Sequence, residues 1–266
     1  MKKIQYLLTA CGLLLAGCSE TPGGDAAQPA PAPVKYVSLR ISAAAGTRAG
    51  LDGDLRVKFR PGDMIDINGR PYEVFLLDDG SAAVPEVPEA DRYEAVFPSA
   101  YNFLQQTREG ANFKLPLAQF YAGPGTFGHN AMPMYGEATG IDGDKGYVNL
   151  TMRTLCGVLK LTLKGSATIN TILVEDRSGA PVSGYATLGT DGEGNKILVP
   201  GTASSARAYR LVMNCGGAGE GVALNESGTD FYIVMPAREY ASGLKIRITD
   251  RSHRAMTVDS PTPRTI

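Results

Sequence analysis

The first chemically distinctive group in the chain is the thiol of Cys18, which directly follows Leu15-Ala16-Gly17. A cysteine in this position can carry a diacylglycerol on its thiol and, once cleavage frees its amine, a further acyl chain such as palmitate. Met1-Lys2-Lys3 and the apolar residues 6–15 match a secretory signal, and this stretch is shorter than the roughly 20 apolar residues that span a bilayer. The sequence therefore predicts a signal peptide over residues 1–17 and lipid attachment at Cys18. An ordinary secretory signal with a chance cysteine is the alternative.

The segment that follows the anchor predicts a tether. Residues 18–33 are mostly small, polar or proline, a composition that cannot bury a core and stays extended where proline is dense. At about 0.8 kcal/mol per buried methylene, two or three acyl chains hold a protein durably at a membrane. Ser19 stands where an aspartate would favour the inner membrane. We therefore expect a cell-surface lipoprotein of the outer membrane, with the membrane leaflet left open.

A second group with specific chemistry is Arg48, within Thr47-Arg48-Ala49. An arginine in a segment of small residues is an accessible site for an Arg-specific protease, which would cut between Arg48 and Ala49. Any exposed arginine offers this chemistry, so the meaning of the site depends on what precedes it. Val37, Leu39 and Ile41 alternate there with polar residues and predict a strand with one apolar face, which such a cut would release.

Two cysteines remain after processing, Cys156 and Cys215, because Cys11 leaves with the signal and Cys18 is acylated. They could form one disulfide in an oxidising envelope. They could equally be two small apolar residues in buried strands, since their spacing matches no motif.

Catalytic patterns are poorly represented. The chain has two histidines, His129 and His253, and contains neither a G-x-S-x-G nor an H-E-x-x-H motif. A lone histidine such as His129 is most often a solvated loop residue. The Asp-Gly clusters do not complete an EF-hand, because Lys196 stands where one of them would need glycine, so hairpin turns explain them better.

We therefore expect no catalytic residue, no metal site, no cofactor and no enzymatic activity. The carboxylate pair of a glycosidase can be far apart in sequence, so spacing alone does not test that alternative.

The elements that must position these groups are predicted to be β-strands almost throughout. Alternation of apolar and polar residues recurs at residues 55–59, 158–163, 210–213 and 244–248, and 32 glycines and 17 prolines supply frequent turns. These features favour antiparallel β-sandwiches. Residues 101–107 are the one place where we expect a short helix.

Composition limits the domain organisation and the partners. Glycines are dense between Gly136 and Gly146, and strand patterns restart on either side, so we expect β-sandwiches over residues 34–145 and 146–266. Loss of Lys2 and Lys3 reduces the 26 basic residues to 24 against 27 acidic ones, which excludes a strongly basic surface for nucleic acid.

Glycan binding is an alternative function, because β-sandwich lipoproteins on surfaces often bind sugars through exposed aromatic rings. The chain has no tryptophan but has twelve tyrosines. Four of these tyrosines fall in strand patterns, where core or half-buried packing is the usual outcome: Tyr72, Tyr93, Tyr185 and Tyr232.

Taken together, the signal, the tether, the alternating strand and Thr47-Arg48-Ala49 are followed by four segments in a characteristic order. These are Phe59–Ile65, Tyr93–Pro98, Met132–Gly136 and Phe231–Pro236. The whole mature chain in this way resembles the fimbrillin-like (Mfa-like) proteins, the lipoprotein subunits of type V pili. The resemblance implies two transthyretin-like Greek-key β-sandwich domains, surface export, cleavage after Arg48 and donor-strand exchange with other pilus subunits.

The carboxy terminus departs from this family. Polymerising pilins end in strands that can be donated, whereas Met256 and Val258 alternate only briefly before Pro261 and Pro263 interrupt the pattern. Either the sequence continues beyond Ile266, or this subunit accepts a strand without donating a standard one, as a terminal or accessory member would.

We therefore expect a structural, adhesive subunit of a fimbrium. The alternative is a monomeric surface lipoprotein that binds glycan or another extracellular ligand.

Overall fold

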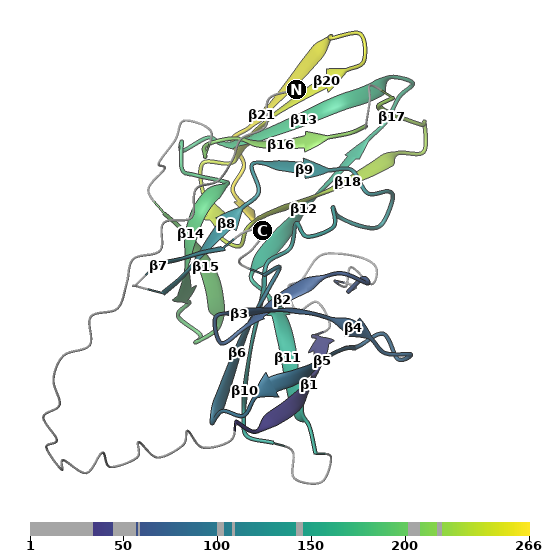
Figure 1. Cartoon of the computed structure of the whole chain (residues 1–266). Helices are drawn as coiled ribbons and strands as arrows, with labels where there is room; N and C mark the ends of the chain where they lie inside the picture. The colour runs from purple at the N-terminus through teal and green to yellow at the C-terminus, as the bar shows by residue number, and fades with distance from the viewer. Residues whose placement is uncertain are drawn as a thin grey trace, which may run out of the picture. The chain divides into compact units, whose positions relative to one another are not determined.

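The computed structural model describes residues 34–44, 57, 59–99, 104–107, 110–141, 146–201, 208–216 and 220–266 (Figure 1). Val34–Ile266 form one compact unit. All the regular secondary structure of the described residues is β-strand, which confirms the all-β prediction. Among these residues no helix is long and apolar enough to cross a membrane.

An eight-stranded sheet is built from the first strands of the chain and two later ones. Its members are β1 (Tyr36–Ala43), β2 (Met64–Ile67), β3 (Arg70–Glu73), β4 (Phe75–Leu76), β5 (Ala82–Pro88), β6 (Arg92–Phe97), β10 (Met134–Thr139) and β11 (Val148–Thr154). Their order across the sheet is β3-β2-β6-β10-β11-β1-β5-β4. The strand nearest the amino terminus of the described chain therefore lies inside this sheet.

A second group of strands surrounds another core. One sheet contains β9 (Ala118–Phe120), β13 (Thr168–Asp176), β16 (Leu211–Asn214), β17 (Val222–Ala223), β20 (Leu244–Asp250) and β21 (Ala255–Ser260). Its order is β21-β20-β13-β16-β9, with β17 also paired to β13. The layer packed on it is a pair of strands, β12 (Cys156–Leu163) and β18 (Thr229–Pro236).

Two smaller sheets complete the described structure. One has the order β15-β14-β8-β7, and the other pairs β19 with β22. Their members are β7 (Leu104–Thr107), β8 (Gly110–Leu115), β14 (Gly184–Thr190), β15 (Lys196–Pro200), β19 (Glu239–Tyr240) and β22 (Arg264–Thr265).

The alternation read from the sequence places apolar side chains in two core clusters. The first cluster takes residues from β1, β2, β5, β6, β10 and β11, and Phe59 packs its ring edge on the ring of Phe97 at 5.2 Å between centroids. The second takes residues from β13, β16, β18 and β20. In both, every second residue of a strand points inward, as the period of a β-strand requires.

Strand pairing crosses the boundary expected between residues 145 and 146. β11 follows that boundary, yet it joins the sheet of β1 and β10. β8 and β9 precede it, yet they pair with β14 and β16. Two domains over 34–145 and 146–266 stay a prediction, and a division there would have to separate strands that are hydrogen bonded to each other.

The helix expected over residues 101–107 is wrong where the structure describes it. Residues 104–107 form β7, which pairs with β8 from Leu104 opposite Phe113 to Thr107 opposite Gly110. A helix this short forms few of its own hydrogen bonds, whereas a hairpin pairs the backbone with the next strand. Asn68 and Gly69, with φ of 48° and 77°, form the turn that joins β2 to β3, as an Asn-Gly pair between two strands favours.

Gly136 in β10 tests how tightly the first core is packed. A Cβ at this position would lie 2.7 Å from Leu150 Cδ2, 2.8 Å from Met152 Sδ and 2.9 Å from the carbonyl oxygen of Thr151. We therefore predict that Gly136→Ala lowers the free energy of unfolding by about 1–3 kcal/mol in urea titrations. Gly192→Ala is the control, because nothing lies within 4 Å of its Cβ. Equal stability of the two variants would contradict this packing.

Candidate strand-exchange site

β1 occupies an interior position, between β11 and β5 (Figure 1). It runs parallel to β11, with Leu39 opposite Val148 and Ala43 opposite Met152. It runs antiparallel to β5, with Ile41 opposite Ala82. Removal of β1 would therefore leave two strands with unpaired backbone groups, the condition under which a sheet takes up a strand from another chain.

The apolar side chains on the inner face of β1 are all buried. Val37 is 9% exposed, and Leu39 and Ile41 are both 0% exposed. The apolar face predicted for this strand is therefore its buried face. At roughly 1.5–3 kcal/mol per large apolar side chain, the three side chains contribute on the order of 5–9 kcal/mol, as much as the whole stability of many domains. A chain without β1 would thus require a replacement strand to stay folded.

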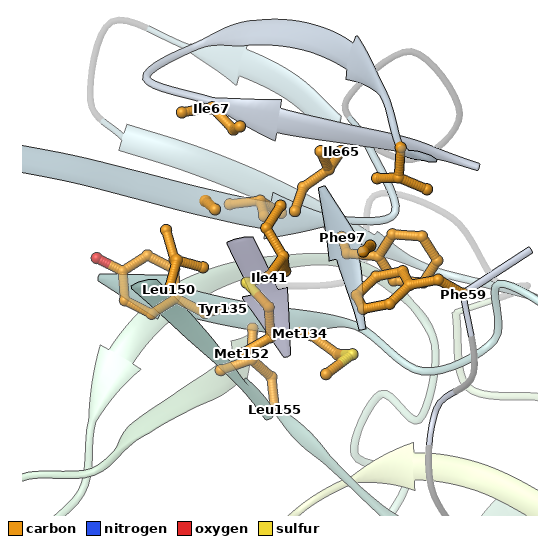
Figure 2. Packing of buried hydrophobic residues seen from close by; sticks show 14 of the residues in the cluster. Ile41, Phe59, Ile65, Ile67, Phe97, Met134, Tyr135, Leu150, Met152 and Leu155 are labelled. Atoms are coloured by element: carbon orange, nitrogen blue, oxygen red, sulfur yellow. The ribbon is translucent and has the colours of Figure 1, made fainter. Parts of the chain in front are cut away.

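The residues around Ile41 form the apolar surface on which β1 packs. Figure 2 shows its side chain in the centre of the first core, among Met134, Leu150 and Met152. These residues come from β10 and β11, so the apolar surface under β1 belongs to the strands that would remain. A replacement strand would need apolar side chains at the same alternate positions.

The two ladders of β1 differ in regularity. The pairing with β5 shifts between Val37, which lies opposite Val87, and Leu39, which lies opposite Val84, so β5 contains one extra residue there. Glu86, in this bulge, has a φ of 55°. A bulge leaves part of the ladder unpaired. The ladder to β11 is therefore the continuous one.

The outer face of β1 is fastened by Arg40. Its guanidinium donates to Ser81 Oγ at 3.3 Å and to the Tyr147 hydroxyl at 3.4 Å, and it forms an ion pair with Asp79. Hydrogen bonds from Ser81, together with Arg40, hold the pKa of Asp79 below its usual value. Because the pair is solvent exposed, it adds little to stability and mainly fixes register.

The processing residues lie beyond this strand. The last bond of the segment is from the Ala44 N–H to the Met152 carbonyl at 2.8 Å. Cys18, Arg48 and Ala49 are outside the described residues. Lipidation of Cys18 and an exposed position for Arg48 therefore stay predictions.

The proposed disulfide is wrong, because Cys156 and Cys215 are both free and buried. Cys156 begins β12 and belongs to the first core cluster, whereas Cys215 follows β16 and belongs to the second. Each thiol thus packs as a small apolar group in its own core, which was the other sequence-based reading. Burial raises the pKa of both thiols, and that of Cys215 reaches about 12.

His129 and the four tyrosines of the predicted strands have mixed outcomes. His129 Nε2 lies 2.7 Å from Oδ1 of the buried Asp63, so it is a paired residue and not a freely solvated one. Tyr93 and Tyr232 are buried and Tyr72 is half-buried, as predicted, while Tyr185 is exposed. Among the described residues no group of three His, Cys, Asp or Glu side chains is placed to hold a metal ion.

A shallow hollow of about 310 Å3 lies beside β13 and bears on the alternative of ligand binding. Its lining includes Glu175, Asp176, Arg177, Tyr209, Lys245 and Asp259. Most of these charges are already paired: Arg177 with Asp259 at 2.6 Å, Glu175 with Arg210 at 2.8 Å and Asp176 with Arg238 at 2.9 Å. The hollow thus offers one aromatic ring for stacking, that of Tyr209.

Models of known protein families give no match to this chain, and no curated protein matches it significantly. A "putative cell adhesion protein" from Bacteroides uniformis is similar in structure, with a TM-score of 0.45 and 15% identity over 84% of this chain and 85% of the other. A DUF3823 family protein from Bacteroides ovatus has a TM-score of 0.24 and 11% identity over 87% of this chain and 99% of the other. Neither likeness is strong enough to decide fold or function.

Substitutions in β1 should separate its inner and outer faces. We predict that Leu39→Ala lowers the free energy of unfolding by about 2–5 kcal/mol, because it opens a cavity in a closed core. Ser38→Ala, on the exposed face of the same strand, should change it by less than about 0.5 kcal/mol. Urea unfolding of the uncut protein measures both. A small effect of Leu39→Ala would show that β1 is not a structural member of the sheet.

The thiols should be chemically silent in the folded protein. In a chain that begins at Ser19, Cys156 and Cys215 are the only cysteines. At pH 8 their raised pKa values keep them protonated, and burial blocks access, so we predict no alkylation by iodoacetamide until denaturant is added. Mass spectrometry should then show two modified thiols. A denatured chain that takes up no label without reductant would reinstate the disulfide.

Proposed function

We propose that this chain is a structural, adhesive lipoprotein of the cell surface, a fimbrillin-like pilus subunit that assembles by strand exchange. The observation that carries the proposal is the position of β1. It is an interior strand with three buried side chains, and three residues separate its end at Ala43 from Thr47-Arg48-Ala49. A protease that cuts there would turn a structural strand into an exchangeable one.

The proposed sequence of events follows from this arrangement. Cys18 anchors the precursor to the outer membrane through its acyl chains, and an Arg-specific protease cuts between Arg48 and Ala49. A strand from a neighbouring subunit then takes the place of β1 between β11 and β5, by β-augmentation. The proposed role of this chain is to bind other subunits through its strands, so we assign it no catalytic group, metal or cofactor.

Cleavage alone would not empty the site. After the cut, β1 keeps its backbone ladders to β11 and β5 and the burial of Val37, Leu39 and Ile41. Spontaneous loss would expose these side chains and both strand edges at once. We therefore propose that the incoming strand displaces β1 stepwise, so that each lost pair is replaced as it breaks.

We propose that this chain accepts a strand and does not donate β21 or β22, as a subunit at an end of the fibre or an accessory subunit would. Among the described residues after Asp250, two strands pair within the chain, β21 with β20 and β22 with β19. A strand held in this way is not presented to a neighbour.

The amino terminus of the protein taken from cells tests the proposal. We predict that the membrane-bound precursor begins with an acylated Cys18 and that the assembled form begins at Ala49. Arg48→Ala should leave only the acylated form and prevent assembly, whereas Arg70→Ala, at an exposed arginine in β3, should be processed normally. Fatty-acid labelling and amino-terminal sequencing give both readouts.

An uncut, acylated chain that remains monomeric would instead support the alternative of a monomeric surface lipoprotein. Assembled fibres that still contain β1 would overturn strand exchange itself.

A further inference from the structure

The two layers around the second core are unequal in width. Apolar residues of neighbouring strands form rows on the inner face of the wider sheet, and one row runs from Ile172 of β13 to Ile248 of β20 and Met256 of β21. Exposure along this row rises from 0% to 5% and then to 54%. The parallel row through Val174 and Ile246 ends at Val258, which is 41% exposed. No strand of the described residues therefore covers the inner face of β21.

The opposite layer ends short on the same side. The side-chain amide of Gln119, in β9, donates to the Val234 carbonyl at 2.7 Å and accepts from the Val234 N–H at 3.0 Å, which closes the outer edge of β18. Tyr121, just after β9, also contacts the ring of Phe231 in β18. Since β9 and β21 are at opposite ends of the wider sheet, β18 lies toward β9 and its partner β12 lies toward β21.

The pairing of β12 with β18 then fixes which backbone groups are free. Val234 turns its N–H and C=O toward Gln119 and hence away from β12, and its partner is Val158. In an antiparallel pair, such outward residues recur at every second position on both strands. Val158, Lys160 and Thr162 therefore point their N–H and C=O groups outward. We call these three residues the β12 edge.

No described residue pairs with the β12 edge. The alternate residues of the strand, Leu159, Leu161 and Leu163, pack on the second core but stay half-exposed. A strand added here would lie beside these leucines and opposite Met256 and Val258. It would satisfy the backbone of β12 and cover the open end of both apolar rows.

One end of this space is closed by the chain itself. A Cβ at Gly157 would lie 2.4 Å from the carbonyl carbon of Ile266, so the last residue packs directly on the start of β12. The Ile266 N–H donates to the Arg238 carbonyl at 3.1 Å.

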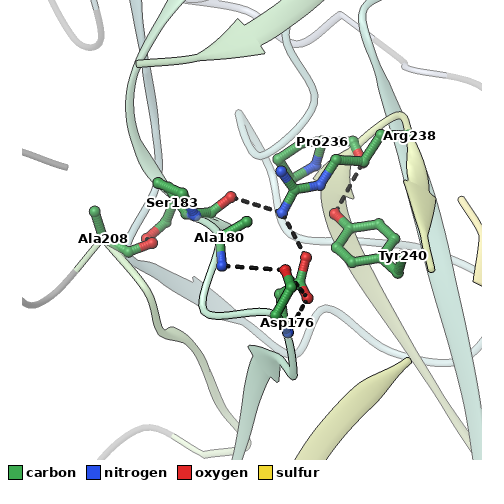
Figure 3. Close-up of polar contacts among 9 residues, drawn as sticks. Asp176, Ala180, Ser183, Ala208, Pro236, Arg238 and Tyr240 are labelled. Atoms are coloured by element: carbon green, nitrogen blue, oxygen red, sulfur yellow. Dashed lines mark hydrogen bonds and ion pairs between the residues drawn. The ribbon is translucent and has the colours of Figure 1, made fainter. Parts of the chain in front are cut away.

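Contacts of Arg238 support this closed end. Figure 3 shows that Arg238 reaches Asp176, and its guanidinium lies 2.9 Å from Asp176 Oδ2 and 4.7 Å from the centre of the Tyr240 ring. The Tyr240 hydroxyl donates to the Pro236 carbonyl at 3.0 Å. Ile266 therefore blocks the start of β12 for an added strand. Such a strand has to lie along the rest of β12, toward its other end.

Two cations lie at that other end. Lys164 follows β12 directly, and the Arg251 N–H donates to the Thr168 carbonyl at 2.8 Å, which places the β20–β21 turn beside the start of β13. Neither Lys164 nor Arg251 forms an ion pair with another described residue. A carboxylate on the added strand would find two unpaired cations here.

We propose that the β12 edge binds a β-strand of another polypeptide, apolar at every second residue and acidic at the end beside Lys164 and Arg251. The three outward residues span five positions of β12, so the contact needs a segment of about five to seven residues. This site is separate from the place of β1, and none of the described residues covers it before cleavage. The inference therefore does not rest on cleavage at Arg48.

The probes are two fluorescent peptides in which valine alternates with threonine. One has glutamate at its amino-terminal end and the other at its carboxy-terminal end, so that either strand direction is tested. We expect one of them to bind the uncut chain that begins at Ser19 and to slow hydrogen exchange at the N–H groups of Val158, Lys160 and Thr162. Lys160→Pro removes one outward N–H and should weaken binding about tenfold or more, while Lys160→Ala keeps that N–H and is the matched control.

Two further variants separate binding from folding. Val258→Thr changes an exposed side chain, and Lys164→Glu reverses an exposed charge, so both should fold normally by circular dichroism. Each variant should weaken binding of the glutamate peptide. A peptide with lysine in place of glutamate should bind Lys164→Glu more tightly than the glutamate peptide does.

Equal binding by Lys160→Pro and Lys160→Ala, or protection outside β12, would overturn the proposal. Concentration-dependent dimers that protect the β12 edge without peptide would also overturn it, in favour of a second copy as the occupant. Because every measurement uses uncut protein, failure here would leave processing at Arg48 untouched.

Discussion

The eight-stranded sheet depends on the simultaneous pairing of β1 with β11 and β5. These two strands lie far apart in the sequence, and β1 is the element that joins them through two backbone ladders. Its Leu39 and Ile41 fill the centre of the first core. Since the contacts are non-local, their loss would separate the two halves of the sheet and expose its core at the same time. This is why we regard β1 as structural in the precursor.

The same physical rule explains the two strand-binding places that we propose. A strand is stable in a sheet when its backbone groups are paired and one face is covered. In the first core this condition is met by β1, which belongs to the same chain. In the second core it fails at the β12 edge, where Met256 and Val258 remain exposed across from half-covered leucines. The first place is filled by β1 until exchange, and the second is left uncovered by the described residues.

Local sequence was least informative where the outcome depended on distant partners. Residues 104–107 carry no strong period, and their pairing with β8 produced a strand instead of the expected helix. Cys156 and Cys215 were the only pair left for a disulfide, but their strands bring them into different cores. His129 looked like a solvated loop residue, yet Asp63, far away in the sequence, lies within hydrogen-bonding distance.

The sequence by itself determined the all-β class and the inward face of β1, because the two-residue period of a strand is written in the alternation of Val37, Leu39 and Ile41 with polar residues. It also placed the turn at Asn68-Gly69, since a turn with positive φ needs only local residues. Only the tertiary structure decided that β1 lies between a parallel and an antiparallel neighbour, and that β12 has a single partner among the described strands. Strand order depends on which distant segments meet, and the period of a single segment carries no information about its neighbours.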